Sequence, residues 1–169
     1  MLVIELFLLL AGGALAAFLH YKLRIPLNMP GHHGLEFMAI FMLIRMESGL
    51  KYAATIATLG TGIVLLLPGL GAENPMNSIG YILPGIVLDQ VYILSRGKIR
   101  MLFAAALLGG IAYASIPFSR LIISLATGYQ YMAFVKFGTL YTTLSFFFFG
   151  IMGGLLGYGL SRIKSTFFK

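Results

Sequence analysis

Long apolar runs that are almost free of charge constrain the fold of this sequence more than any other feature. The stretch 2–18 contains one charged residue, Glu5, and the stretch 101–117 contains none. A transmembrane helix needs about 20 mostly apolar residues, whereas a transmembrane strand would show segments of about ten residues with alternating polarity. The continuous runs therefore predict membrane-spanning helices and an all-α fold.

The composition leads to the same conclusion, because too few polar residues are present to cover a water-soluble globule. Only 10% of the 169 residues are charged and 59% are hydrophobic, whereas a soluble domain carries about 25% charged residues. Lipid should therefore contact most of the outer surface. The net charge of +7 is then explained by membrane orientation, and we expect no nucleic-acid partner. The absence of cysteine excludes disulfides and thiolate metal sites.

The apolar runs divide the chain into six expected spans within a single transmembrane domain, residues 1–169. Their expected bounds are 2–20, 34–46, 50–67, 79–94, 101–126 and 139–160. The second of these is short for a crossing. Two spans separate the densest basic clusters, at 96–100 and 162–169, and basic loops stay preferentially in the cytoplasm. We therefore predict a bundle of six transmembrane helices in a prokaryotic-type cell membrane, with both termini in the cytoplasm.

Small residues recur at four-residue spacing along the first expected span. Gly12 pairs in this way with Ala16, and Gly13 pairs with Ala17. Such pairs allow helix backbones to approach closely in lipid, where no hydrophobic drive joins apolar helices. Two interpretations remain open: the pairs serve packing within the bundle, or this face of the first span binds a helix of a partner protein.

Charged residues within the expected spans mark a candidate site, because they are costly in hydrocarbon. Arg120 lies in the fifth span and Asp89 in the fourth, at depths that would allow a salt bridge if these spans face each other. One interpretation is a structural pair. The other is that Arg120 binds the carboxylate or phosphate of a ligand, for which a guanidinium has suitable geometry.

All three histidines of the chain, His20, His32 and His33, lie in or beside the segment that follows the first span. The neighbouring candidates for a site are Asn28, Met29 and Glu36. His32 and Glu36 would share one helix face if the second helix begins near them. Imidazole, carboxylate and thioether groups bind transition metals or haem iron, although histidines in a turn also serve as ordinary hydrogen-bonding groups.

Two further patterns bear on function. Aromatic residues gather near the start of the sixth span, among them Tyr141, and they form either an interfacial belt or a stacking surface for a flat ligand. The sequence has no nucleophile elbow, no P-loop and no His-x-x-x-His pair within a span. We therefore expect that the protein is not an enzyme.

The layout resembles the substrate-binding S components of energy-coupling factor (ECF) transporters, which take up vitamins and related micronutrients. The segment 24–30, Arg-Ile-Pro-Leu-Asn-Met-Pro, looks like the proline-rich first loop of the biotin-specific members, and the segments 49–54 and 67–69 are similar to their third helix and its exit. Gly13 and Ala17 stand where the family has its small-residue motif. The nickel and cobalt members carry a histidine directly after the initiator methionine, whereas this chain has Leu2, which argues against uptake of a free metal by their mechanism.

The resemblance implies a substrate-binding subunit of an ECF-type importer for a vitamin or related micronutrient, whose first loop covers the ligand at the outer face. It implies no cofactor. The implied partners are a transmembrane coupling subunit, which would contact the small residues of the first span, and cytoplasmic ATPase subunits. The expected substrate-binding residues are Arg120, Asn28, Met29, His32, His33, Glu36, Asp89 and Tyr141.

Two alternatives remain open. The histidines could bind a metal, a haem or a cobalamin-type ring, in a membrane-embedded enzyme or redox protein. The chain could also be a membrane assembly subunit without any ligand. Metal or haem bound to the purified protein would favour the first alternative, and a partner that co-purifies without a ligand would favour the second.

Overall fold

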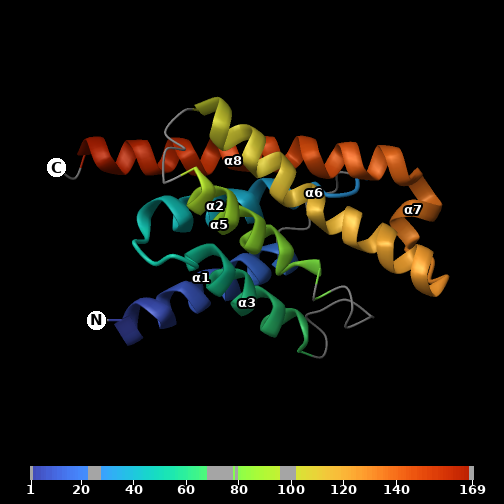
Figure 1. Ribbon diagram of the computed structural model, residues 1–169, viewed down its shortest axis with the longest axis horizontal. Helices are drawn as coiled ribbons and strands as arrows, with labels where there is room; N and C mark the ends of the chain where they lie inside the picture. The colour runs from blue at the N-terminus through green and yellow to red at the C-terminus, as the bar shows by residue number, and fades with distance from the viewer. Residues whose placement is uncertain (1, 23–27, 68–77, 79, 96–101, 168–169) are drawn as a thin grey trace.

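The structure is a computed structural model (Figure 1). It describes residues 2–22, 28–67, 78, 80–95 and 102–167, with side chains up to residue 163. Helix makes up 85% of this part, and it contains no strand. The helices are α1 (Leu2–Lys22), α2 (Gly34–Glu47), α3 (Ala53–Leu65), α5 (Leu83–Leu94), α6 (Leu102–Thr127), α7 (Met132–Phe137) and α8 (Thr139–Phe167). The predicted all-α class is confirmed.

Three helices, α1, α6 and α8, are long and apolar enough to cross a membrane, and they indicate a membrane protein. The helices α2, α3 and α5 have 14, 13 and 12 residues. At about 1.5 Å per residue each is shorter than the roughly 30 Å hydrocarbon core. A helix nevertheless lies within every expected span, and α7 is an additional short helix that the sequence pattern did not predict.

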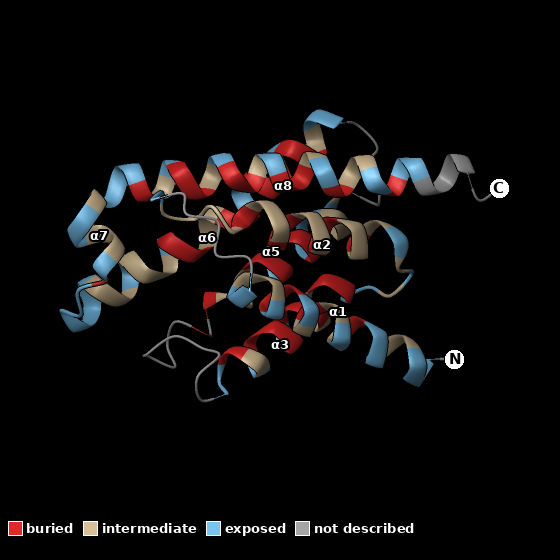
Figure 2. Cartoon of the chain, turned by 180° about the vertical axis from the view of Figure 1, so that it is seen from behind, coloured by how far each residue is buried: buried red, intermediate tan, exposed pale blue. Residues whose placement is uncertain are grey.

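The short helix α2 lies in the middle of the bundle, with α6 and α8 on one side and α1 and α3 on the other (Figures 1 and 2). Its sequence explains this place, because apolar residues cover more than one of its faces. Phe37, Met38, Phe41 and Met42 are each at most 1% exposed. Protein rather than lipid surrounds α2, and it therefore tolerates a charged residue such as Arg45 near its end.

Close contact between the backbones of α1 and α3 explains the small residues of the first span. A side chain on Gly13 would overlap the carbonyl oxygen of Ala57, and Thr61 Oγ1 donates a hydrogen bond of 2.8 Å to the Gly13 carbonyl. The residues predicted to contact a partner were Gly12, Gly13, Ala16 and Ala17. Ala16 and Ala17 are buried, and Gly12 faces a side chain of α2. Packing within the bundle therefore explains these small residues, and contact of the first span with a partner helix stays a prediction.

Both ends of the described chain lie at the same end of the bundle (Figure 1). Two hydrogen bonds connect them through the turn after α2: Ser48 donates to Glu5 of α1 at 2.8 Å, and Ser161 of α8 donates to Glu47 at 2.8 Å. The start of α8 and the α7 helix lie at the opposite end. The basic turn at 96–100 and the basic tail from 164 onward, on which the predicted orientation partly depends, lie outside the described side chains.

Candidate functional site

Two glycines fix the histidine segment against the wall of the bundle. Gly31 has a φ angle of 78°, which favours glycine, and a side chain there would overlap the ring of Phe146 in α8. Gly34 lies equally close to the ring of Tyr113 in α6. The two histidines between these glycines are therefore held at a defined position, next to α6 and α8.

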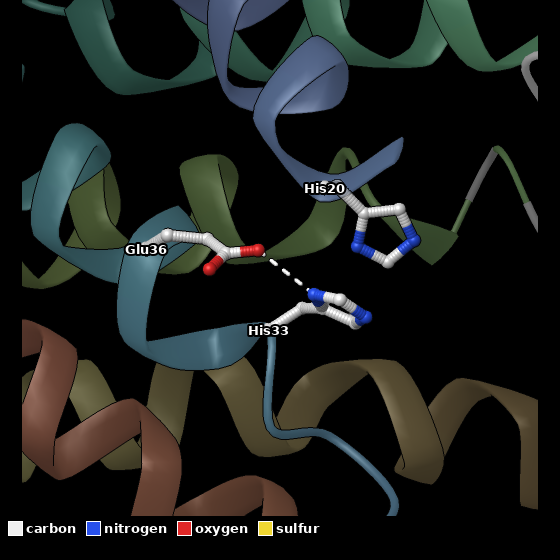
Figure 3. A group of neighbouring side chains, drawn as sticks. All are labelled: His20, His33 and Glu36. Atoms are coloured by element: carbon white, nitrogen blue, oxygen red, sulfur yellow. Dashed lines mark hydrogen bonds and ion pairs between the residues drawn. The ribbon is translucent and has the colours of Figure 1, made fainter. Parts of the chain in front are cut away.

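His20, His33 and Glu36 form a compact polar group, which we call the histidine cluster (Figure 3). His33 Nδ1 and Glu36 Oε1 are 2.8 Å apart, and the ring centroids of His20 and His33 are 4.1 Å apart. One potential ligand atom of each residue lies within 4.8 Å of the others. His20 comes from the end of α1 and the other two from the start of α2, so the cluster joins two helices.

His32 lies beside the histidine cluster and has a different hydrogen-bond partner. Its Nδ1 is 2.7 Å from the carbonyl oxygen of Met29. Asn28 and Met29 are exposed, and Met29 contributes its backbone rather than its thioether. We predicted that His32 and Glu36 share one helix face. In the structure α2 begins directly after His33, and it is His33 that pairs with Glu36.

Arg120 lies among aromatic rings instead of beside a carboxylate. Its Cζ atom is 5.8 Å from the ring centroid of Tyr81, 5.6 Å from that of Tyr131 and 5.9 Å from that of Phe146. We call these four residues the arginine cluster. No acidic residue in the described part of the chain pairs with Arg120. Ring faces attract a guanidinium, but they leave its N–H donors without acceptors.

Three buried polar atoms without a hydrogen-bond partner gather in this region: Arg120 Nε, His20 Nδ1 and Tyr131 Oη. Tyr81 connects them, since its ring centroid is 5.9 Å from that of His20 and 5.8 Å from Arg120 Cζ. A buried polar atom left unpaired costs about 1–3 kcal/mol, and such atoms are rare unless water, an ion or a ligand satisfies them. Their concentration here marks the candidate binding site.

The Tyr131 hydroxyl adds a hydrogen-bond donor to the arginine cluster. Burial raises its pKa above the ordinary value of 10.0, although the nearby Arg120 acts in the opposite direction. The phenol is therefore protonated at neutral pH. A guanidinium and a phenol together present donors, which suits a ligand group that only accepts hydrogen bonds, such as a carboxylate or a phosphate.

Asp89 does not belong to this site, and its predicted pairing with Arg120 is wrong. Arg45 Nη1 donates to Asp89 Oδ1 at 2.7 Å, and both residues are buried. Thr55 donates to Asp89 Oδ2 through its backbone N–H and its hydroxyl, each at 2.7 Å, and the Ala54 N–H donates to Oδ1 at 3.2 Å. Asp89 thus joins the end of α2 to the start of α3, at the end of the bundle that holds the chain termini.

Tyr141 also lies outside the arginine and histidine clusters. It is 45% exposed and its ring packs against Phe137. The inward stripe of α8 near this point is formed by Thr142, Ser145, Phe146 and Phe149. These positions follow helical spacing and Tyr141 is not among them. Its position fits an interfacial belt rather than a stacking surface for a ligand.

The sequence patterns did not identify Tyr81, Tyr131 or Phe146 as site residues. Tyr81 lies just before α5 and Tyr131 just before α7. Phe146 lies within a run of four phenylalanines, which points to all sides of a helix and therefore does not indicate the side that faces the bundle. The only signal was the density of aromatic residues between 129 and 141. Packing of α6 against α5 and α8 brings these rings together, and no spacing within one segment encodes that.

The fold and these clusters define a class: a helical protein of membrane type with unsatisfied polar groups buried at one end of its bundle. The chain matches no protein-family model, no curated protein and no solved structure. Its function therefore has to be argued from the arginine and histidine clusters.

Proposed function

We propose that this protein is the substrate-binding membrane subunit of an ECF-type importer, and that it binds a vitamin or related micronutrient through an anionic group at the arginine cluster. The observation that carries the proposal is that Arg120, whose Nε is buried without a hydrogen-bond partner, has no counter-charge among the described residues. A cation inside a membrane protein normally pairs with an anion of the protein, and where it does not, a ligand is the natural partner.

The proposed topology has six crossings with both termini in the cytoplasm. The hydrogen bonds Ser48–Glu5 and Ser161–Glu47 support it, because they place the two ends of the chain and the turn after α2 together. Arg45 and Lys51 flank that turn, and short basic segments remain preferentially in the cytoplasm. In this orientation the arginine cluster lies toward the outer side of the membrane, where a solute arrives.

The arginine cluster favours a ligand with a carboxylate or phosphate on a flat or apolar body. The Arg120 guanidinium and the Tyr131 hydroxyl would donate to the anionic oxygens. Tyr81 is stacked on Phe37 and Phe146 on Tyr113, so a planar ligand body could stack only on the faces of Tyr81 and Phe146 that these rings leave open. Ser145 donates a hydrogen bond of 2.6 Å to the carbonyl of Pro30, which ties the end of the first loop to α8 beside the cluster, as a covering loop requires.

Partner subunits would supply the energy for uptake. The sequence contains no nucleotide-binding P-loop, so active import would depend on cytoplasmic ATPases and on a transmembrane coupling subunit. The face of α1 that carries Gly13 is covered by α3, and a coupling subunit would have to use another face. Leu8, Leu15 and Phe18 are exposed on α1 and are open to such a subunit or to lipid.

Native mass spectrometry of the detergent-purified protein tests the proposed function. We expect the wild type to retain a small molecule other than lipid, and Arg120→Met to lose it while its circular dichroism spectrum stays helical. Arg162→Met, at the opposite end of the bundle, is the matched control and should retain the molecule. The proposal fails if the wild type carries only lipid, or if Arg120→Met retains the molecule as fully as the wild type does.

A further inference from the structure

We propose that the histidine cluster binds one divalent transition-metal ion, with His20, His33 and Glu36 as its protein ligands. Two imidazoles and one carboxylate form a ligand set that zinc and neighbouring transition metals accept, with a further coordination position left for water or another ligand. This site is separate from the anion binding proposed for Arg120, and neither proposal depends on the other.

The potential ligand atoms need only small movements to reach a common ion. They lie within 4.8 Å of one another, and a tetrahedral ion with bonds near 2.0–2.1 Å holds its ligand atoms roughly 3.4 Å apart. His33 Nδ1 and Glu36 Oε1 are closer than this, at 2.8 Å, because a hydrogen bond joins them. The ion would take the place of the proton in that bond. A neutral His33 keeps one ring proton, which would then lie on Nε2, and only a doubly protonated ring would release a proton to solvent.

A purely structural role explains only part of the histidine cluster. The pairing of His33 with Glu36 in the first turn of α2 is an ordinary contact between residues three apart. It does not explain His20, whose Nδ1 is buried without a hydrogen-bond partner and whose ring lies against that of His33 (Figure 3). Two imidazole rings in contact repel each other when they carry charge, whereas a shared metal ion would give both a partner.

The surroundings suit a partly enclosed ion. The side chains of His33 and Glu36 are 17% and 9% exposed, and the ring centroids of Phe37 and Tyr81 lie 5.2 and 5.9 Å from that of His20. The Glu36 carboxylate would offset the charge of the ion, which matters because Arg120 adds positive charge on the other side of Tyr81. Removal of the Arg120 charge should therefore leave metal affinity unchanged or raise it.

Titration of the metal-free, full-length protein with Zn²⁺ and with Co²⁺ tests this site. The protein is purified through a tag without histidine and treated with a chelator, and binding is followed by calorimetry and by the visible absorption of bound Co²⁺. We expect one ion per chain. Loss of an outer-shell partner of a metal ligand costs about 10–100-fold in affinity, and His20→Gln and Glu36→Gln should each weaken binding at least as much, since each removes one of three direct ligands.

Two residues outside the histidine cluster provide matched controls, His32→Gln and Glu47→Gln. His32 is adjacent to His33 but directs its Nδ1 to Met29, and Glu47 is the last residue of α2. Both variants should bind the ion as the wild type does. Arg120→Met should bind it at least as tightly, although it loses the anionic ligand proposed above, so the two proposals fail separately.

Three results would overturn the metal site: no binding of either ion by the wild type, wild-type affinity in His20→Gln, or equal loss in His32→Gln and His20→Gln. Far-UV circular dichroism establishes that each variant is folded. If His20→Gln does not fold, Glu36→Gln decides the question, because glutamine has nearly the shape of glutamate and can still accept the hydrogen bond from His33.

Discussion

Two arginines inside the bundle differ in how fully their hydrogen-bond donors are used. Arg45 donates to Asp89 at 2.7 Å and to the carbonyl oxygens of Lys51 and Ser48, each at 3.0 Å. Arg120 has only ring contacts among the described residues. The Nε atoms of both arginines are buried without a hydrogen-bond partner, so the difference between the two residues is the counter-charge that Asp89 gives to Arg45. A buried charge with a counter-charge holds structure together, whereas one without it lowers stability and is retained for another purpose. The two residues should therefore respond in opposite ways to substitution.

Asp89→Asn should lower the free energy of unfolding by about 3–5 kcal/mol, because it leaves the buried Arg45 without its counter-charge. The side-chain amide nitrogen of the new asparagine is itself a donor, and it would face either the Arg45 guanidinium or the N–H of Thr55, which are also donors. Unfolding in detergent followed by far-UV circular dichroism measures the change, since the chain contains no tryptophan to report by fluorescence. Wild-type stability in Asp89→Asn would mean that backbone carbonyls alone satisfy Arg45.

Arg120→Met should leave the free energy of unfolding within about 1 kcal/mol of the wild type or raise it, because methionine fills similar space without a charge to satisfy. The same unfolding experiment applies, with Arg45→Met as the comparison, for which we expect a loss of about 3–5 kcal/mol. Equal losses in the two variants would give Arg120 a structural role and would remove the main support for ligand binding.

At the scale of the helices, glycines allow neighbouring helices to approach each other closely on both sides of the bundle. A side chain on Gly60 of α3 would overlap the carbonyl oxygen of Leu10 in α1, close to the contact made by Gly13. On the other side, Gly109 of α6 and Gly150 of α8 lie backbone to backbone. Packing of this kind joins apolar helices in lipid through close contact rather than through burial of apolar surface from water.

Gly13→Ala should destabilise the protein by about 1–3 kcal/mol, because the new methyl group meets the backbone of α3, which cannot move aside as a side chain can. Gly12→Ala is the matched control. Its methyl group would meet only the flexible end of Ile44, at 3.0 Å, and the gain in helix propensity of up to about 1 kcal/mol is the same for both substitutions. The difference between the two free energies of unfolding therefore reports the contact between α1 and α3. Equal values would show that this contact is not close.

The sequence predicted the helices better than it predicted their contacts. A long apolar run has few ways to satisfy its backbone other than a helix, and a helix lies within each expected span. The short helix α7 was not predicted, because a segment of six residues shows no clear hydrophobic period. The histidines and Glu36 were recognised as a group because they are close along the chain. Asp89 was assigned to the wrong partner, because depth within a span does not specify which neighbouring helix a residue faces, and α5 begins at Leu83 rather than at 79.

At the scale of the whole molecule, the number of crossings separates the proposed importer subunit from a simpler membrane protein. If only α1, α6 and α8 crossed the bilayer, an odd number of crossings would place the two ends of the chain on opposite sides. The hydrogen bonds Ser48–Glu5 and Ser161–Glu47 oppose this, because through α2 they hold the start of α1 near the end of α8. An even number of crossings is then required, and the proposed importer subunit has six, with the short helices α2, α3 and α5 crossing as well within a locally thinned bilayer or a protein surround.

Single cysteines distinguish these topologies, since the chain has none of its own. Lys22, Gly49 and Gln130 are exposed. They lie at or just after the ends of α1, α2 and α6, so each reports the side of the membrane that the chain has reached after that helix. With six crossings and the termini inside, a maleimide that cannot cross the membrane should label Lys22→Cys and Gln130→Cys on intact cells and spare Gly49→Cys. With three crossings it would label Lys22→Cys and Gly49→Cys and spare Gln130→Cys. Labelling of Gly49→Cys alone would keep the six crossings but invert them, and the arginine cluster would then face the cytoplasm, where it could not receive a solute from outside.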